Sequence, residues 1–301
     1  MSEIKTMPYS KTVFVTGATG LIGKELWTPL TKAGFEVYAL AIEDNLPQVP
    51  HIHWLKGNLF DPANINHLMA QIKPQYLLNM AWATTGDYQV SNINFDFLCA
   101  GIQLLKAFYA NGGKRVIFAG TCLEYAPQNH PIKETDPIAP PVPYALCKQL
   151  LFQSTQSFCT QNKLSFACGR IFYVYGKGEA PTRLTASIIN SLQSGKTVSI
   201  NHSQLVKDYM YTKDIARAFV ALLGSSVQGA VNICTRQGIS LAQYATTIAK
   251  LLGKENLLDL KELPTTQPLQ IVGDNTRLTQ EVGYTPTYTL KQALWEILER
   301  Q

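Results

Sequence analysis

The chain has 301 residues, is 46% hydrophobic and 16% charged, and carries a formal net charge of +5. This length and composition are ordinary for a globular protein with one large domain or two closely packed ones. The basic residues are scattered rather than gathered in a stripe, which argues against a nucleic-acid partner. No apolar run approaches the roughly 20 residues that span a bilayer, so no membrane partner is expected.

The N-terminus, the cysteines and the histidines suggest a compartment and a metal-free protein. The opening sequence MSEIKTMPYSK has no apolar secretory core, so we expect a cytoplasmic location. The six cysteines form no C-x-x-C pair and are expected to be free thiols. His51 and His53 lie two positions apart, which is a weak pattern for metal ligands, and no metal site is expected.

Short β-rich runs alternate with helical stretches through the first half of the chain. Asp61 and Pro62 mark the start of one helix, as N-cap and first helical residue. The expected strands are residues 12–16, 36–42, 52–56, 76–81 and 115–119, and the expected helices are residues 21–33, 62–73 and 92–110. This alternation is typical of a parallel sheet with helices on both faces.

The second half starts with a proline-rich loop and then becomes less regular. A helix at 144–161 and a strand at 164–171 continue the alternation, and further helices are expected at 184–194, 212–223 and 241–252. We therefore predict an α/β protein. Its first domain, residues 1–175, is expected to be a doubly wound parallel sheet. A smaller, irregular α+β lobe follows at residues 176–301, with some chain crossing between the two.

A glycine-rich motif, TGATGLIG, follows the first expected strand and precedes a helix. Glycines at this position let the backbone approach a pyrophosphate, and the free N–H groups of the following turn can bind it. The motif predicts dinucleotide binding through residues Gly17, Thr19, Gly20, Leu21, Ile22 and Gly23. Residues 1–175 are therefore expected to form a Rossmann-type dinucleotide-binding domain, which leaves residues 176–301 as the substrate lobe.

The choice between NAD and NADP depends on the end of the second strand. An acidic residue there binds the ribose 2′-hydroxyl and repels a 2′-phosphate. The expected acid position holds Ala41, with Glu43 and Asp44 just beyond it and Lys24 as a nearby cation. Both NADP and NAD therefore remain open as the cofactor.

The sequence PYALCK places Tyr144 and Lys148 four residues apart on an expected helix, so that they share a face. A tyrosine has an ordinary pKa of about 10, and a nearby ammonium brings it closer to the range of acid–base catalysis. Thr121 follows the strand at 115–119 and brings a hydroxyl to the edge where open α/β sheets bind ligands. We predict Thr121, Tyr144 and Lys148 as the catalytic group.

Together these motifs resemble the extended short-chain dehydrogenase/reductase family of nucleotide-sugar epimerases, dehydratases and ketoreductases. The segments NMAWAT, GRIFYVYGKGE and LVKDYMYTKDIARAF extend the resemblance over nearly the whole chain. It implies that Thr121 bonds the C4 oxygen of the sugar, that Tyr144 exchanges a proton with that oxygen, and that Lys148 binds the cofactor ribose and lowers the tyrosine pKa. It also places four further residues on the cofactor: Asn58, Leu59, Ala81 and Trp82.

The chain departs from the family pattern directly after Thr121. Dehydratases of the family carry an Asp-Glu pair there, whereas this chain has Cys122 and Leu123, which argues against 4,6-dehydration. Glu124 admits two interpretations. It is either a loop carboxylate bonded to nearby backbone or a neighbouring base, or a contact to a sugar hydroxyl that also orients Tyr144.

Other departures concern the substrate. Tyr173 replaces a usual asparagine, and Lys207 replaces an arginine that often binds the nucleotide diphosphate. Arg183 is either a second phosphate contact or an ordinary surface residue. The expected substrate-binding residues are Thr121, Cys122, Glu124, Tyr173, Arg183 and Lys207.

We predict an NAD(P)-dependent C4 ketoreductase of a nucleotide-activated deoxy sugar. A 4-epimerase that retains its NAD is the alternative, and a non-catalytic dinucleotide-binding sensor is a third. A homodimer is expected through the helices at 92–110 and 144–161. Their apolar side chains, for which a core-facing role is the alternative, are Leu104, Leu105, Phe108, Leu151, Phe152 and Phe158.

Overall fold

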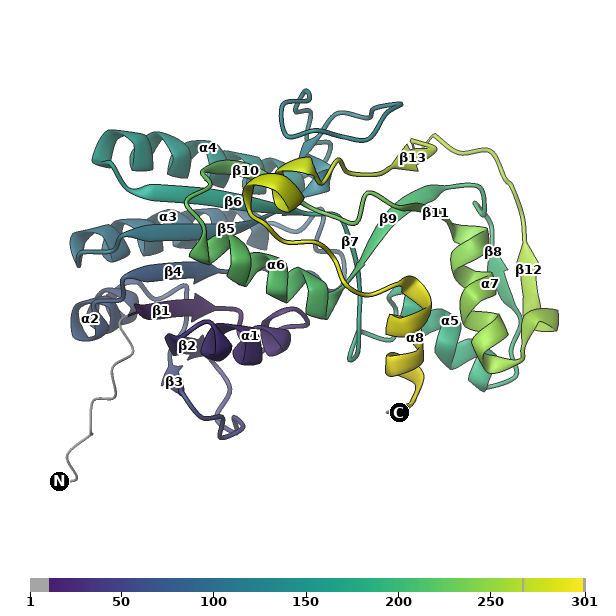
Figure 1. The fold of residues 1–301 in the computed structure, drawn as a ribbon, viewed down its shortest axis with the longest axis horizontal. Helices are drawn as coiled ribbons and strands as arrows, with labels where there is room; N and C mark the ends of the chain where they lie inside the picture. Colours follow the sequence, from purple (N-terminus) through teal and green to yellow (C-terminus); the bar gives the residue numbers. More distant parts are fainter. Residues whose placement is uncertain (1–10, 267, 300–301) are drawn as a thin grey trace.

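The computed structural model describes residues 11–266 and 268–299. Residues 1–10, on which the expectation of no secretory leader largely rests, lie outside this range. A seven-stranded sheet forms the larger part of the molecule, in the order β10-β6-β5-β4-β1-β2-β3 (Figure 1). All of its strand pairs are parallel. The strands are β1 (Lys11–Thr16), β2 (Phe35–Ala41), β3 (Ile52–Lys56), β4 (Tyr76–Asn79), β5 (Arg115–Thr121), β6 (Ser165–Ile171) and β10 (Gly229–Ile233).

Helices cover both faces of this sheet and bury an apolar core on each. One face packs against α2 (Pro62–Ile72), α3 (Ile93–Ala110) and α4 (Pro143–Asn162), and the other against α1 (Trp27–Lys32) and α6 (Thr212–Gly224). The predicted fold class, a doubly wound parallel sheet with helices on both faces, is confirmed. Because β1 pairs with both β2 and β4, the chain direction across the sheet reverses beside β1, where ligands bind in such folds.

Local signals explain where two of the helices begin and end. The Asp61 carboxylate caps α2 by accepting hydrogen bonds from Ala63 N (3.0 Å) and Asn64 N (3.1 Å), as its place before a proline predicts. The helix expected at 21–33 is instead a 3₁₀ turn, Gly23–Glu25, followed by the short α1. Pro29 has no N–H to donate and its ring crowds the preceding turn, so a continuous helix is disfavoured there.

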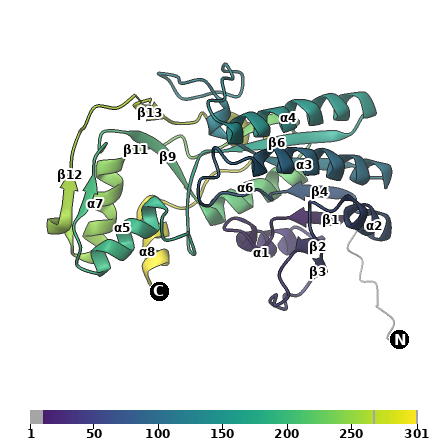
Figure 2. The ribbon, with the colours of Figure 1, turned by 180° about the vertical axis from the view of Figure 1, so that it is seen from behind.

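A smaller lobe lies beyond one end of the large sheet (Figures 1 and 2). Its strands β7 (Tyr173–Tyr175), β9 (Val206–Tyr211), β11 (Gly238–Ser240) and β13 (Gln270–Ile271) form one sheet, and β8 (Val198–Ile200) pairs with β12 (Leu258–Leu260). The helices α5 (Leu184–Gln193), α7 (Leu241–Leu252) and α8 (Leu290–Glu299) pack around a core that includes the buried Tyr175 and Tyr244. Helix α8 was not among the expected helices.

The chain returns from the smaller lobe to complete the larger one. Strand β10 adds to the edge of the sheet beside β6, and α6 packs on one sheet face. The buried Arg115 guanidinium on β5 fixes this return by donating to Leu223 O (3.1 Å) and Leu222 O (2.8 Å) of α6. The domain boundary at residue 175 stays a prediction. Beyond this boundary in the sequence, β10 and α6 nevertheless pack with the large sheet of the first domain.

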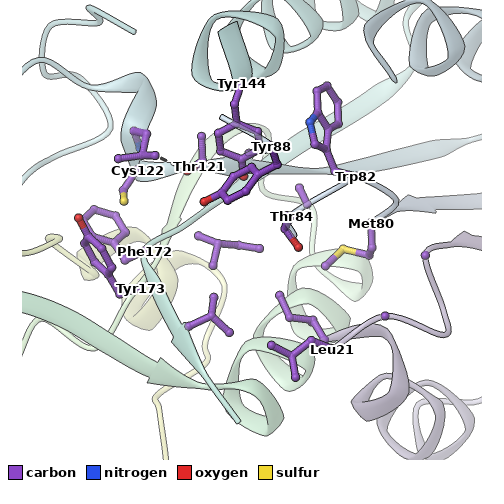
Figure 3. A pocket seen from close by; sticks show the side chains of 18 of the residues that line it. Leu21, Met80, Trp82, Thr84, Tyr88, Thr121, Cys122, Tyr144, Phe172 and Tyr173 are labelled. Carbon is purple, nitrogen blue, oxygen red and sulfur yellow. Dashed lines mark hydrogen bonds between the residues drawn. The ribbon is translucent and has the colours of Figure 1, made fainter. Parts of the chain in front are cut away.

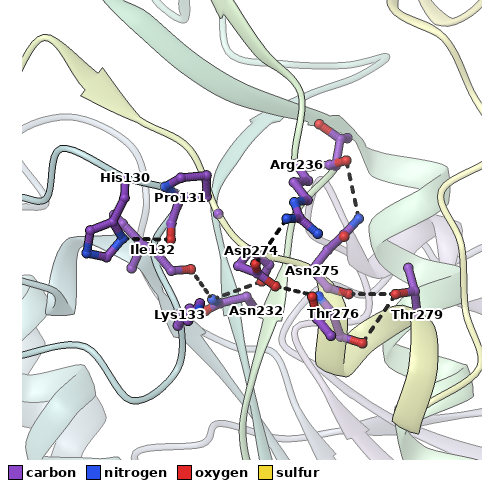
Figure 4. Close-up of polar contacts among 12 residues, drawn as sticks. His130, Pro131, Ile132, Lys133, Asn232, Arg236, Asp274, Asn275, Thr276 and Thr279 are labelled. Atoms are coloured by element: carbon purple, nitrogen blue, oxygen red, sulfur yellow. Dashed lines mark hydrogen bonds and ion pairs between the residues drawn. The ribbon is translucent and has the colours of Figure 1, made fainter.

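The proline-rich loop is pinned to this returning segment (Figure 4). The Asn232 side chain on β10 donates to Ile132 O (2.8 Å), and Asp274 N donates to the same carbonyl (2.8 Å). Arg236 forms an ion pair with Asp274 at 3.6 Å. These contacts hold the loop that leads into α4 and thereby fix the start of the helix that carries Tyr144.

Two expectations, free cysteine thiols and no membrane-spanning segment, can be compared with this fold. The six cysteines are free thiols, of which Cys99 is exposed and the other five are buried. Within residues 11–266 and 268–299, every helix is too short or too polar to cross a bilayer.

Candidate functional site

A cavity of about 420 Å³ lies at the carboxyl ends of β1, β4 and β5, between the sheet and the smaller lobe. The glycine-rich loop lines one part of it, and Thr121, Tyr144 and Lys148 line another. Side chains from the smaller lobe complete the wall (Figure 3). The structure therefore brings the expected cofactor loop and the expected catalytic group into one space.

The glycine-rich loop forms a tight cradle that side chains would fill. Gly17 has a φ of +70°, and a Cβ there would lie 2.7 Å from Ala81 N of the neighbouring strand end. A Cβ on Gly23 would overlap the Gly17 carbonyl oxygen. Because the backbone is bare and faces the cavity at Gly17, Gly20 and Gly23, these residues fit a dinucleotide pyrophosphate.

A carboxylate reaches this cradle from a position that the sequence interpretation did not assign. Glu43, two residues beyond the expected acid position Ala41, accepts a hydrogen bond from Thr19 Oγ1 at 3.1 Å. Asp44 instead pairs with Lys56 at 2.5 Å. Glu43 is thus the acidic side chain that contacts the glycine-rich loop. It follows the end of β2, where such folds bind the ribose hydroxyls of the cofactor.

The remaining expected cofactor residues occupy two places. Asn58 and Leu59 follow β3, where Asn58 Oδ1 accepts a hydrogen bond from Phe60 N at 3.0 Å, and they lie outside the cavity wall. Ala81 and Trp82 follow β4 and line the cavity. Their roles toward a cofactor stay predictions.

Thr121 and Tyr144 meet at the centre of the site (Figure 3). Thr121 is the last residue of β5, and Tyr144 lies in the first turn of α4. Burial raises the pKa of the Tyr144 phenol above its ordinary value, with Tyr88 adding to the rise, and a hydrogen bond with the Thr121 side chain opposes it. The phenol is therefore protonated near neutral pH. The expected lowering of the Tyr144 pKa by Lys148 is wrong for this structure, because burial dominates and the ammonium lies 6.0 Å from the centre of the Tyr144 ring.

Lys148 lies one helical turn after Tyr144 and is 6% exposed. Its ammonium donates to Ala119 O (2.6 Å) and sits 4.0 Å from the centre of the Trp82 ring, a cation–π contact. Burial lowers the pKa of Lys148 to about 8. The Trp82 indole is itself fixed by donating to Asn94 Oδ1 at 2.7 Å.

Glu124 lies behind Thr121 and outside the cavity wall. It is fully buried, and its two oxygens accept hydrogen bonds from Thr121 N (2.7 Å) and Arg170 Nε (2.8 Å). Burial raises the pKa of the Glu124 carboxyl, and the Arg170 guanidinium opposes the rise. These contacts match the interpretation of a loop carboxylate bonded to backbone and a base, and a contact to substrate stays a prediction.

Cys122 and Leu123 form an apolar part of the wall beside Thr121, together with Phe172. Burial raises the pKa of the Cys122 thiol to about 12, so it is neutral and unsuited to proton transfer near neutral pH. Cys122 and Leu123 thus supply no carboxylate at the two positions where a dehydratase of the resembled family carries one each, although Glu179 lines the cavity elsewhere.

Three expected substrate residues come from the smaller lobe. Tyr173 lines the cavity, and its ring centre lies 5.2 Å from the Lys207 ammonium, which is 5% exposed and outside the cavity wall. Arg183 lines the cavity and donates to Thr84 O at 3.0 Å. Their roles toward substrate stay predictions.

Several residues of the cavity wall were not identified from the sequence, among them two tyrosines. Tyr88 comes from the loop between β4 and α3, and Tyr209 comes from β9. An aromatic residue in the loop after the fourth strand is a weak local signal, because only the folded chain brings it against Tyr144. Within the described ranges, no three or more His, Cys, Asp or Glu side chains are grouped so that they could hold a metal ion.

Comparison with known proteins gives consistent matches over most of the chain. Residues 13–234 match the model of the NAD dependent epimerase/dehydratase family. The dTDP-4-dehydro-6-deoxyglucose reductase of Escherichia coli is 22% identical, over 95% of this chain and 96% of that protein. The UDP-glucose 4-epimerase of Lacticaseibacillus casei is 24% identical, over 92% of each. The crystal structure of UDP-glucose 4-epimerase from Thermotoga maritima with UDP-glucose superposes with a TM-score of 0.86 at 20% identity, covering 96% of this chain and 97% of that one.

Proposed function

The chain belongs to the NAD dependent epimerase/dehydratase family, and from this we propose that it is a C4 ketoreductase of a nucleotide-activated deoxy sugar. The observation that carries the proposal is the protonated Tyr144 phenol beside Thr121, next to an apolar wall that lacks acid–base groups. The E. coli relative named as a dTDP-4-dehydro-6-deoxyglucose reductase supports the same reaction class.

Reduction of a ketone requires a proton donor at the carbonyl oxygen, and Tyr144 is suited to this role. Because its pKa is raised by burial, the phenol holds its proton until a developing alkoxide is close enough to take it. Thr121 lies within hydrogen-bond reach of Tyr144 and would bond the same sugar oxygen. Both groups would then stabilise the negative charge that grows on that oxygen during reduction.

The cofactor would supply the hydride, and the chain would hold it at two points. The loop at Gly17, Gly20 and Gly23 would bind the pyrophosphate. The Lys148 ammonium uses one N–H group to bond Ala119 O. Its two other N–H groups would bind the ribose next to the nicotinamide. Glu43 beside Thr19 favours NAD, because its carboxylate would bind a 2′-hydroxyl and repel a 2′-phosphate.

The wall at Cys122, Leu123 and Phe172 favours a deoxy sugar as substrate. These side chains present thiol, aliphatic and aromatic surface next to the catalytic pair. Burial of a methyl substituent against such a surface is favourable in free energy. A hydroxyl at the same place would lose its hydrogen bonds to water without replacement. A nucleotide sugar is the proposed partner, with Arg183 and Lys207 as candidate contacts to its phosphates.

A 4-epimerase is the second candidate, because it would use the same Thr121, Tyr144 and Lys148. The likeness to the L. casei and T. maritima epimerases favours it. The two functions differ in cofactor use. An epimerase returns the hydride to its own substrate and keeps NAD, whereas a reductase consumes one reduced cofactor in each turnover.

We also propose a cytoplasmic homodimer. The predicted interface residues Leu104, Leu105, Phe108 and Leu151 are buried in the chain's own core and cannot form it. Exposed apolar side chains on the same two helices are better candidates, namely Phe95 on α3 and Leu146 and Leu150 on α4, which are 45%, 40% and 36% exposed.

The decisive experiment measures cofactor consumption. Purified protein is mixed with NADH or NADPH and dTDP-4-dehydro-6-deoxyglucose, and the loss of absorbance of the reduced cofactor is followed together with the sugar product. The proposal expects stoichiometric oxidation of the cofactor. Protein that is isolated with bound NAD, and that interconverts UDP-glucose and its C4 epimer without added cofactor, would instead establish the epimerase.

A further inference from the structure

The loop between β4 and α3 brings a second phenol against Tyr144. Tyr88 lines the cavity, and its ring centre lies 5.0 Å from that of Tyr144 with the ring planes at 86° (Figure 3). The next residue of the loop, Gln89, accepts a hydrogen bond from Tyr144 N at 3.0 Å. The loop is therefore attached to the start of α4 directly beside the proposed proton donor.

The Tyr88 hydroxyl is available to donate a hydrogen bond to a ligand. It points into the cavity, toward the space between Thr121, Cys122 and Tyr173 (Figure 3). In the part of the chain that the structure describes, its only hydrogen bond is a long one from Gln89 Nε2 at 3.4 Å, in which the phenol oxygen accepts. Its own O–H is left to donate to a ligand in the cavity.

Tyr88 has contacts through its backbone on one side and through its ring on the other. Asn94 Nδ2 donates to Tyr88 O at 2.6 Å, which ties the loop to α3. From the smaller lobe, the Arg183 guanidinium lies 5.9 Å from the centre of the Tyr88 ring and donates to Thr84 O at 3.0 Å. The loop backbone is bonded to α3 and the ring packs on Tyr144, which supports the side chain as a specificity contact requires.

We propose that Tyr88 is a further substrate-contact residue, whose O–H donates a hydrogen bond to an oxygen on the sugar carbon next to the one served by Tyr144. This rests on the proposed function, because it assumes a sugar ring in the cavity. The ligand class it selects is a sugar that keeps a hydroxyl beside the reacting carbon. Arg183 is then a positioning residue for Tyr88 through its contacts with the ring and with Thr84.

The substitution Tyr88→Phe removes the hydroxyl and keeps the ring that packs on Tyr144. In the presence of oxidised cofactor, we expect the Kd of dTDP-4-dehydro-6-deoxyglucose by calorimetry to rise about 10-fold, as loss of one hydrogen bond implies. The Kd of dTDP, which lacks the hexose on its terminal phosphate, should stay the same. Tyr109→Phe, an exposed tyrosine on α3, is the matched control and should change neither value.

Turnover gives the second measurement. The KM for the sugar should rise about as much as the Kd, with the KM for the cofactor unchanged. Equal sugar affinities in Tyr88→Phe and wild type, or an equal loss of affinity for dTDP, would overturn the assignment of Tyr88 while leaving the ketoreductase intact. A wild type that binds the sugar nucleotide without reducing it would overturn the proposed function, and the two Kd values would still decide the role of Tyr88. A wild type that binds neither probe overturns both proposals.

Discussion

The Glu124 carboxylate joins the Arg170 guanidinium to the backbone of Thr121. One oxygen accepts from Arg170 Nε at 2.8 Å and the other from Thr121 N at 2.7 Å, and both charged side chains are at most 2% exposed. Arg170 in turn donates to Gln149 Oε1 on α4 at 3.0 Å. This buried chain of contacts ties β5, β6 and α4 together behind the catalytic group, and so fixes where the Thr121 hydroxyl lies.

Removal of Arg170 should therefore destabilise the protein strongly. The substitution Arg170→Met leaves the Glu124 carboxylate buried without its partner, and we expect the free energy of unfolding to fall by about 3–5 kcal/mol. Urea denaturation at neutral pH measures this change. Arg217→Met should cost less than about 1 kcal/mol, because this arginine is 42% exposed and lies 3.8 Å from Asp214, which keeps its hydrogen bonds from Tyr284 and Thr287. A similar small loss in both variants would contradict the structural role of the pair.

Tyr144→Phe tests the proton donor. The phenylalanine keeps the ring contacts with Trp82 and Tyr88 and removes the acidic proton. We expect kcat to fall by about 10²- to 10⁴-fold, with cofactor affinity and melting temperature nearly unchanged. Retention of more than a tenth of the wild-type kcat would exclude Tyr144 as the essential acid.

Glu43 should set the cofactor preference. The wild type is expected to bind NADH at least about 10-fold more tightly than NADPH, because the carboxylate beside Thr19 repels a 2′-phosphate. Glu43→Gln should reduce this ratio, mainly through tighter binding of NADPH, as fluorescence titration can show. Asp44→Asn, the control, should leave the ratio unchanged, because that carboxylate is engaged with Lys56.

Cofactor affinity should depend on pH through Lys148. Burial lowers the pKa of this lysine to about 8, so the ammonium that would bind the ribose is present below pH 8 and is lost as the pH rises. We expect the Kd of the cofactor to be constant below about pH 7 and to increase above about pH 8. Lys148→Met should bind more weakly than the wild type below about pH 8 and should lose this dependence. A wild-type Kd that is flat up to pH 10 would show that the lysine keeps its proton in the complex.

Leu150→Glu tests the proposed dimer. A charge on this exposed position of α4 should be tolerated in a monomer but not in a buried interface, so we expect sedimentation to show a shift from dimer to monomer. Leu260→Glu, on the strand β12 of the smaller lobe, is a control at an equally exposed leucine. A dimer that survives Leu150→Glu would place the interface elsewhere.

The sequence predicted those features whose signals are local. Strand–helix alternation predicted the parallel sheet, and the Asp61–Pro62 cap predicted the start of α2, because each depends on neighbouring residues. The conjunction of Thr121, Tyr144 and Lys148 in one cavity followed from the strand-end position of Thr121, the four-residue spacing of Tyr144 and Lys148 on a helix, and the family resemblance. Pro29 shows a local signal that was overlooked, since it shortens the helix after the glycine-rich loop.

Features that depend on distant contacts were harder to predict. Glu124 could not be assigned because its partner Arg170 is 46 residues away, and two interpretations fitted its local surroundings. Glu43 and Tyr88 lie in loops whose conformations are set by contacts with other segments, so nothing in the neighbouring residues placed them at the site.

The late return of β10 to the large sheet has a consequence for the order of folding. A nascent chain that ends near residue 175 already carries β1 to β6, but it lacks the strand that pairs with β6 and the helix α6 that covers one face. An open strand edge and an uncovered apolar face both invite association with other chains. Closing the sheet also requires a long loop, residues 172–228, which includes β7, α5, β8 and β9 of the smaller lobe and slows folding. We therefore expect the sheet to reach its native form only after most of the chain has left the ribosome, with the smaller lobe folding as part of that closure.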